Sequence, residues 1–188
     1  MNRTDKFEKN KITKASTNKV VCNVWYDSFG IEKVRFQNAK YDGDRESIDF
    51  YVDFEDMALL AQDAASGRII KELDKGPINL YLGGTKSSKN YNGGPESRVF
   101  SLGKSGEGDK TKIFINLSRG KGKITETGAI APDGAPDLKI GVPMTIDKFR
   151  SMMIYIHDWI NAYLAHLTNA LVKQCEQERK EFQSSNNN

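Results

Sequence analysis

Apolar and polar residues alternate along several stretches of the chain, and this period of two is typical of half-buried β-strands. In the first such stretch, Val20, Cys22, Val24 and Tyr26 share one face. The same alternation predicts strands at 20–26, 31–41 and 46–54 in the first half, and at 78–82, 97–102, 111–118, 121–127 and 138–142 in the second. The chain is therefore rich in short strands that follow one another closely, as in antiparallel sheets.

The period changes to a helical one at two places. Asp53 suits an N-cap, and the apolar residues after it recur at helical spacing until Gly67, which predicts a first helix. Thr145 is predicted to cap the longest helix, over 146–174. One side of this helix carries apolar residues at steps of three and four: Ile146, Phe149, Met153, Ile156, Ile160, Tyr163, Leu167 and Leu171. An offset stripe of Met152, Tyr155 and Trp159 favours a partner helix or subunit, with core packing as the alternative.

Each half of the chain thus repeats one order of elements, several antiparallel strands and then a helix. We expect an α+β fold built as two repeats, 19–75 and 76–175, within a single domain at 19–175. Residues 1–18 are basic and show no apolar period, which predicts a flexible arm. Residues 176–188 balance acids against bases and end in SSNNN, which predicts a disordered tail.

Composition narrows the class of protein without identifying it. Of 188 residues, 38% are apolar and 28% are charged, and the net charge is only +3. An excess this small does not indicate a nucleic-acid binder, so only the distribution of charge can. No apolar run approaches the roughly 18 residues needed to cross a membrane, and the N-terminal segment lacks the apolar stretch of a signal peptide. We expect a cytoplasmic protein, in the host cytoplasm if its source is viral, without a membrane partner.

Candidate catalytic and metal-binding residues are few. Cys22 and Cys175 have no partner spacing that a zinc site or a disulfide framework would need. His157 and His166 fall on opposite sides of one predicted helix, so they are not expected to share a metal. His157 and Asp158 could form an acid–base pair, but no nucleophile or third group accompanies them. We therefore expect no enzyme activity, no cofactor and no metal.

The faces of the predicted strands that point away from the core carry aromatic rings among polar or basic neighbours. These are Trp25 beside Asn23, Tyr51 between Asp49 and Asp53, Tyr81 beside Asn79, and Phe114 between Lys112 and Asn116. The strand at 31–41 adds Lys33 and Arg35. A protein that binds single-stranded nucleic acid without reading its sequence stacks rings on unpaired bases and contacts phosphates with nearby cations. The open alternative is that these rings pack against other protein.

Two glycine-rich segments add positive charge. Lys86, Lys89 and Tyr91 lie in a loop at 83–94, which is long enough to close over a ligand. Arg119-Gly120-Lys121-Gly122-Lys123 is a basic cluster whose glycines leave backbone N–H groups open to a phosphate. Either segment could instead be an ordinary solvated hairpin tip.

A duplicated unit of antiparallel strands closed by a helix, in a chain of this size, resembles the Whirly-type single-stranded DNA-binding proteins. Their fold is related to those of positive cofactor four and of the Pur-type repeats. The resemblance covers 18–174, and Lys121-Gly122-Lys123 loosely echoes the family's Lys-Gly-Lys-Ala-type segment at a different position in the chain. It implies a curved pair of sheets, helices that build an oligomer (often a tetramer), and sequence-independent binding of unpaired strands. No residue of the family's site is carried over to this chain.

The predicted function is sequence-independent binding of single-stranded DNA in replication, recombination or repair, for example in a phage or mobile element, by a homo-oligomer formed through the C-terminal helix. The predicted interface comprises stacking rings and phosphate-binding cations: Trp25, Lys33, Arg35, Tyr51, Tyr81, Lys86, Lys89, Tyr91, Lys112, Phe114, Arg119, Lys121 and Lys123. Two alternatives remain open, an RNA-binding protein of the same fold and a protein–protein interaction module with no nucleic-acid ligand.

Overall fold

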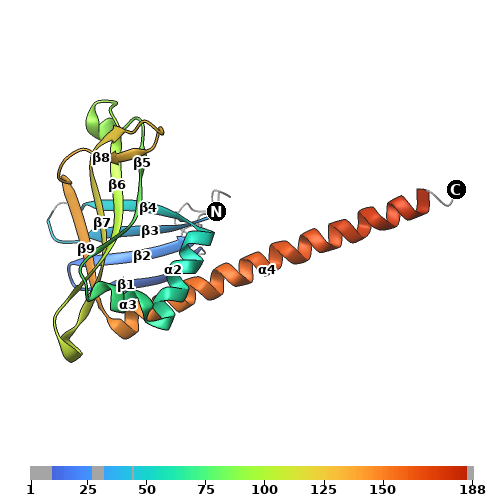
Figure 1. The fold of residues 1–188 in the computed structure, drawn as a ribbon, viewed down its shortest axis with the longest axis horizontal. Coiled ribbons are helices and arrows are strands. Elements are labelled where there is room, and N and C mark those ends of the chain that lie inside the picture. The colour runs from blue at the N-terminus through green and yellow to red at the C-terminus, as the bar shows by residue number, and fades with distance from the viewer. Residues whose placement is uncertain (1–9, 27–31, 44, 186–188) are drawn as a thin grey trace.

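The computed structural model of the chain describes residues 10–26, 32–43 and 45–185. It contains two antiparallel sheets, and the strands of one run across those of the other (Figure 1). Two helices and the start of a third lie beside the sheets, and the third then leaves the body of the protein (Figure 1). The α+β class that the sequence predicts is confirmed.

The first sheet, sheet A, is a meander in which each strand pairs with the next along the chain. Its strands are β1 (Lys11–Ser16), β2 (Val20–Tyr26), β3 (Lys33–Lys40) and β4 (Ser47–Asp53), in the order β1-β2-β3-β4. The strands β2, β3 and β4 confirm the alternation in the sequence, because Cys22, Val34, Phe36 and Phe50 all point into the core. We call the opposite side the outer face of sheet A.

Strand β1 corrects the predicted flexible arm at 1–18. Residues Lys11–Ser16 pair with β2 through a register that shifts between Lys11 and Thr13. The sequence gives little sign of this strand, because only Ile12 and Ala15 are apolar and the irregular register breaks their alternation. The strand hydrogen-bonds to the edge of β2 and also buries Ala15, while Ile12 packs against the core. The rest of the predicted arm, 1–9, lies outside the described residues.

Helices α2 (Phe54–Ser66) and α3 (Arg68–Leu73) connect the two sheets. Met57, Leu60 and Ala64 of α2 are buried at helical spacing, as predicted, and Gly67 ends the helix at a φ of 82°. Glycine suits this left-handed conformation because it has no Cβ to clash. Asp53 occupies the N-cap position, but its side chain makes no capping hydrogen bond.

The second sheet, sheet B, is built around its longest strand. Its strands are β5 (Ile78–Thr85), β6 (Glu96–Ser105), β7 (Lys112–Ile124), β8 (Ile130–Pro132) and β9 (Leu138–Thr145). Their order is β5-β6-β7-β8, and β9 also pairs with β7. The first part of β7 pairs with β9 and its last part with β8. The segments at 111–118 and 121–127, predicted as two strands, therefore belong largely to one. The short helices η1 (Lys89–Tyr91) and η2 (Gly108–Lys110) lie in the connecting loops.

Strand β5 corrects the predicted orientation of Tyr81. Its register with β6 shifts between Asn79 and Tyr81, so the side chains after the shift exchange faces. Tyr81 therefore packs inward, with its ring centroid 5.9 Å from that of Phe100, and Leu82 is 58% exposed. The sequence places these two residues the other way round because strict alternation cannot anticipate an extra residue in one strand.

The core lies where the two sheets cross. The ring of Phe100 from sheet B lies 4.9 Å from that of Phe36 and 5.9 Å from that of Phe50, both from sheet A. Asn38 of sheet A is fully buried, and its side-chain amide donates hydrogen bonds to the backbone carbonyls of Ile115 and Ile140. These contacts join the sheets by apolar packing and by one buried polar link.

Helix α4 (Ile146–Ser185) begins against the body and ends far from it (Figure 1). The hydroxyl of Thr145 accepts a hydrogen bond from the backbone N–H of Lys148 at 3.2 Å, so the predicted cap is confirmed. The predicted disordered tail at 176–188 is wrong up to Ser185, because the helix continues through it. Glu, Gln, Lys and Arg are strong helix formers, and Gln174 hydrogen-bonds Glu178 one turn later at 3.0 Å.

Candidate nucleic-acid interface

The predicted interface residues fall into three places on the structure. Trp25, Lys33, Arg35 and Tyr51 lie on the outer face of sheet A, with Tyr81 across from them on β5. The β5–β6 loop and the far half of β7 carry Lys86, Lys89, Tyr91, Arg119, Lys121 and Lys123. Lys112 and Phe114 lie on the side of sheet B that points away from the core. The first two places are neighbours, because β5 lines the cleft beside β4 and leads into the β5–β6 loop.

A row of cross-strand neighbours runs over the outer face of sheet A. It consists of Lys11 on β1, Trp25 on β2, Arg35 on β3 and Tyr51 on β4. Directly opposite residues in antiparallel strands are about 4.5–5.5 Å apart, so four of them form a continuous line of rings and cations. The row ends at Tyr51, because β4 is the edge strand of this sheet.

The ring of Trp25 lies beneath the cations of this row rather than open to solvent. The residue is only 8% exposed, and the guanidinium carbon of Arg35 lies 5.0 Å from its ring centroid. The ammonium of Lys11 lies 5.7 Å from the same centroid. Arg35 also pairs with Asp49, with Nη2 to Oδ1 at 2.8 Å. A base could therefore stack on Trp25 only if Arg35 moved aside. Tyr51, at the end of the row, is half-buried.

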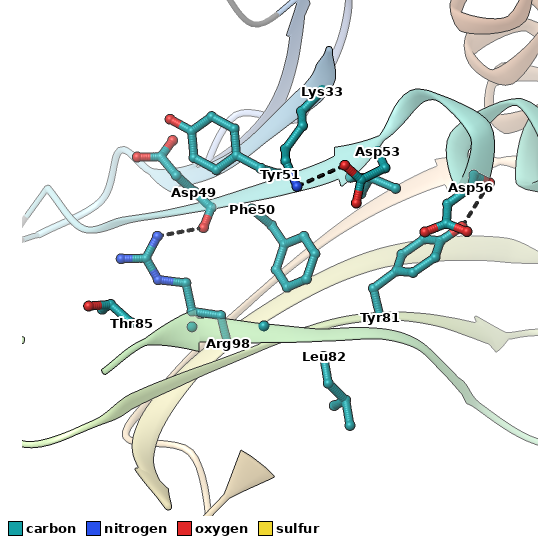
Figure 2. A pocket seen from close by; sticks show the side chains of 13 residues that line it. Lys33, Asp49, Phe50, Tyr51, Asp53, Asp56, Tyr81, Leu82, Thr85 and Arg98 are labelled. Atoms are coloured by element: carbon teal, nitrogen blue, oxygen red, sulfur yellow. Dashed lines mark hydrogen bonds and ion pairs between the residues drawn. The ribbon is translucent and has the colours of Figure 1, made fainter. Parts of the chain in front are cut away.

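Beyond Tyr51, a cleft of about 500 Å³ opens between β4, the edge of sheet A, and β5, the edge of sheet B (Figure 2). Its lining comes mainly from one stretch of each strand, 49–53 on β4 and 81–85 on β5. Phe50 and Arg98 lie between the two strands in Figure 2. The cleft is therefore a product of two strands that are distant in sequence and unpaired with each other.

The open edge of β4 presents backbone groups to this cleft. The N–H of Phe54 donates to the carbonyl of Glu32, and the N–H of Lys40 donates to that of Glu46. Because hydrogen-bonded pairs alternate along antiparallel strands, the backbone N–H and C=O groups of Asp49, Tyr51 and Asp53 point away from β3. Arg98 Nη1 already donates to the carbonyl oxygen of Asp49 at 2.9 Å. The cleft thus offers backbone donors and acceptors as well as side chains.

Charges in the cleft are largely compensated within it. The ammonium of Lys33 lies 2.8 Å from the carboxylate of Asp53 (Figure 2). Arg98 pairs with Glu96 at 2.7 Å. Asp56 adds a further carboxylate to the lining. The interior is therefore not strongly positive, and it suits the polar edge of an uncharged base better than a phosphate.

Tyr81 closes the end of the cleft nearest helix α2. Its hydroxyl donates a hydrogen bond to the backbone carbonyl of Asp56 at 2.9 Å (Figure 2). Burial, together with the nearby carboxylates of Asp56 and Asp63, raises the pKa of Tyr81 to about 12. The phenol therefore stays protonated and holds β5 against α2.

The β5–β6 loop starts at the far end of the cleft and is organised around Glu96, which is fully buried. Its carboxylate accepts hydrogen bonds from Ser88, Asn90 and Arg98 at 2.7–2.8 Å. Burial by itself disfavours the charged carboxylate, but these hydrogen bonds and the charge of Arg98 hold the pKa of Glu96 below its usual range. The Glu96 carboxylate is therefore ionised in the folded protein, and its hydrogen bonds hold the loop in place. It is not set up to transfer a proton.

Basic side chains project from this loop and from the adjoining part of β7. The backbone N–H of Gly122 donates to the carbonyl of Pro95, which brings the two segments together. Lys86, Lys89 and Lys123 are exposed, and within the described part of the chain they form no ion pair. We call this set, with Arg119 and Lys121, the basic loops. The side chain of Lys121 lies 3.5 Å from the carboxylate of Asp133.

Tyr91 is held by a neighbour within the same region. Its hydroxyl donates to Asp137 at 2.7 Å. Burial, the hydrogen bond to Asp137 and the charge of that carboxylate raise the pKa of Tyr91 to about 12, although Arg119 opposes the shift. The ring is therefore anchored beside the basic loops rather than free in a mobile segment.

Phe114 and Lys112 lie apart from the other predicted residues. Phe114 is half-buried between Gly103 and Pro143 on the neighbouring strands. Above it, the same face of sheet B carries Asn116 and several serines and glycines. A shallow hollow of about 220 Å³ lies there, lined by residues such as Ser97, Ser101, Ser118, Gly120 and Lys139. The structure thus gives Phe114 no aromatic partner on its face among the described residues.

Sequence reasoning missed Arg98 and the glycines of β5 as parts of the site. Gly83 and Gly84 were expected in a loop at 83–94, but they lie in β5 and line the cleft. A Cβ on Gly83 would lie 3.5 Å from the ring of Phe50, and one on Gly84 would lie 1.9 Å from the carbonyl oxygen of Glu96. Adjacent glycines after an alternating stretch are a known sign of close backbone approach, and this signal was available in the sequence.

The possible acid–base pair of His157 and Asp158 lies on helix α4. The Nδ1 of His157 lies 3.7 Å from Asp158 on the surface of α4. In the residues that the structure describes, no three His, Cys, Asp or Glu side chains come together as a metal site would require. No helix in the described ranges is long and apolar enough to span a membrane.

Comparisons with known proteins add no identity: no protein family matches the chain, and no curated protein is significantly similar to it.

Proposed function

We propose that the protein binds single-stranded nucleic acid, with DNA as the ligand, along the outer face of sheet A, the edge cleft and the basic loops. The observation that carries the proposal is the cleft of about 500 Å³ at the end of the Lys11–Trp25–Arg35–Tyr51 row. The cleft supplies a place for a base, and the row and the loops supply a path for the strand on either side of it.

Bases and phosphates would occupy different parts of this path. A base in the cleft stacks on the half-buried ring of Tyr51 and hydrogen-bonds to the open edge of β4. The carboxylates of Asp49 and Asp53 do not repel it, since Arg35 and Lys33 neutralise them. Phosphates lie outside the cleft, where the exposed ammonium groups of Lys86 and Lys89 attract them.

The same geometry favours single strands over duplex. A cleft of this size is within the range of small-ligand sites, about 300–1,000 Å³, so it can admit one unpaired base. A paired base keeps its edge against the opposite strand and cannot enter between β4 and β5 without being flipped out. Because most contacts are to stacking faces and phosphates, binding depends little on sequence.

A Whirly-type plan is the finer fold that we propose for this chain. The element order supports it, because a four-stranded sheet and a helix are followed by a second sheet and a long helix. Such a protein would act on exposed strands during replication, recombination or repair.

The proposal is tested by fluorescence anisotropy with labelled oligo-dT, oligo-rU and a duplex of equal length, at about 50 and 200 mM salt. We expect tight oligo-dT binding that persists at the higher salt, with duplex far weaker. Tighter binding of oligo-rU would reassign the ligand to RNA. Equal and weak binding of dT and duplex would contradict the proposal.

A pair of matched variants locates the site. Tyr51→Ala is expected to weaken oligo-dT binding by about 5- to 150-fold, because one stacked base contributes about 1–3 kcal/mol. Tyr155→Ala removes a ring that is 62% exposed on α4, away from the path, and is expected to leave affinity unchanged. Equal effects of the two variants would place the binding site elsewhere.

A second candidate, a protein–protein interaction module, is favoured by the open edge of β4. An extended peptide could pair with the backbone of Asp49, Tyr51 and Asp53 as an added strand. In that case oligo-dT would not compete with the partner, and dT and duplex would bind equally weakly.

A further inference from the structure

Beyond its first turns against the body, α4 forms an isolated rod. Its last fully buried residue is Ile160, and Trp159 and Tyr163 still pack against the core. We call residues 164–185 the stalk. Over its described side chains, 164–180, only Leu167 is partly covered and the others are exposed. At about 1.5 Å per residue the stalk is about 33 Å long, and it stands clear of both sheets in Figure 1.

The stalk carries a narrow apolar seam. Leu164 is 43% exposed and Leu171 is 61% exposed, and together with Leu167 they continue the three- and four-residue steps of the buried part of the helix. Gln174 occupies the next position of this spacing. A helix that lies on a sheet or in a broad groove needs a wider apolar face, whereas a strict heptad seam fits one partner helix.

The chain described here has no helix free to cover that seam. Helix α2 packs against the start of α4, and α3 has only six residues. Among the described residues, therefore, no second helix lies along the seam of the stalk.

We propose that the stalks of two copies of this chain pair as a parallel coiled coil through Leu164, Leu167 and Leu171. In a parallel pair each seam residue faces its own copy, so leucine meets leucine and Gln174 meets Gln174. Residues 173–181 contain three cations (Lys173, Arg179, Lys180) and three acids (Glu176, Glu178, Glu181), so two identical stalks do not repel each other.

The antiparallel arrangement fits less well. Pairing Leu164 with Leu171 in opposite directions would bring Glu178 beside His157 and Asp158 of the other copy, and would lay the charged end of the stalk on Ile154. Ile154 is 43% exposed and apolar, and Asp158 has the same charge as Glu178. A parallel pair avoids both contacts and places the two bodies at the same end of the rod.

The mass of the full chain in solution tests the pairing. Light scattering is expected to give twice the 21.1 kDa of one chain, over about a hundredfold range of concentration. The double variant Leu164→Glu/Leu171→Glu is expected to be monomeric, with unchanged thermal unfolding of the body, since Glu preserves helix propensity. The matched control Ala165→Glu/Val172→Glu adds the same charges one position off the seam and is expected to stay dimeric.

Cysteine crosslinking tests the direction. In a Cys175→Ser background, Gln174→Cys on the seam is expected to form an intermolecular disulfide on mild oxidation, and Lys173→Cys, which faces outward, is not. Cys22 will not interfere because it is fully buried, and burial raises its pKa to about 12. The pairing would be overturned if the unaltered chain were monomeric. It would also be overturned if both double glutamate variants remained dimeric. Equal crosslinking of the two cysteine variants, or none in either, would overturn the parallel seam.

Discussion

The outer faces of the two sheets differ, although both sheets bury their other face in one core. On sheet A, long side chains contact one another across the strands. The Arg35 side chain, for example, contacts both Trp25 and Asp49. On sheet B, the outward positions are mostly serine and glycine, with Phe114 and Asn116 between them. A Cβ on Gly141 would lie 2.4 Å from the Oδ1 of Asn116, so that side chain lies flat on the sheet.

The proposed function depends on this difference between the two outer faces. Rings and cations on sheet A form a row that leads into a cleft, so one ligand can contact several of them together. Phe114 has the same local sequence pattern, a ring between Lys112 and Asn116, but among the described residues no second ring lies beside it on its face. The pattern of one strand is therefore insufficient, and what matters is which strands lie next to it.

The largest expected effect is on the free energy of unfolding. It comes from comparing a residue in the core between the sheets with a residue on the outer face of sheet B. Phe100→Ala removes the ring that contacts Phe36 and Phe50, and it is expected to lower the free energy of unfolding by about 3–5 kcal/mol. Phe114→Ala, on the outer face of sheet B, is expected to cost about 1 kcal/mol or less. Urea unfolding of both variants measures the difference, and similar losses would mean that Phe114 is covered by something in solution.

The next effect tests the polar link between the sheets. Asn38→Leu keeps the branched shape of the side chain but removes two hydrogen bonds to carbonyls of sheet B, and it is expected to cost about 1–3 kcal/mol. Gln37 is the neighbouring residue and lies on the outer face of sheet A. Gln37→Leu removes a side-chain hydrogen bond to Asp49 and is expected to lower the free energy of unfolding by less. Thermal unfolding compares the two. If Gln37→Leu were the more damaging, the outer face would contribute more to stability than the crossing of the sheets.

A smaller effect depends on pH. The folded protein holds the pKa of Glu96 below its ordinary value of 4.5, so its contribution to stability is fully present above that pH and is lost as the pH falls through the folded pKa. Glu96→Gln is expected to lower the free energy of unfolding by about 1–2 kcal/mol at neutral pH, and the gap should narrow in acid. The control is Glu126→Gln at an exposed turn. A gap that is constant with pH would argue that Glu96 is not ionised in the fold.

The smallest effect sharpens the role of the basic loops in the proposed function. Lys86→Ala and Lys89→Ala are each expected to reduce the slope of log K against log salt by about 0.7 for single strands. Lys148→Ala and Lys173→Ala remove exposed cations of α4 and are expected to leave the slope unchanged. Anisotropy titrations at several salt concentrations measure the slopes. Equal slopes for all four variants would mean that the basic loops do not contact the phosphates of the bound strand.

Much of the fold was predictable because its signals are local. Regular alternation identified β2, β3 and β4, and the change of period at Asp53 located α2. Strand β1 was missed because its register shift leaves Ile12 and Ala15, which both pack against the core, three residues apart rather than in regular alternation. Tyr81 was placed on the wrong face because the bulge in β5 shifts the alternation by one residue. The helical end of α4 was missed because its polarity was taken as a sign of disorder.

The sequence by itself determined the α+β class, most of the strands and the two longer helices, the caps at Thr145 and Gly67, and the set of rings and cations on the strands. These features depend on a residue and its neighbours within a few positions. Only the tertiary structure decided that Arg35 covers Trp25, and that β4 and β5 face each other across a cleft. It also decided that the seam of α4 runs out of the body, where no other described element covers it. Those outcomes depend on how two sheets cross, a geometry fixed by contacts between residues as distant as Asn38 and Ile140.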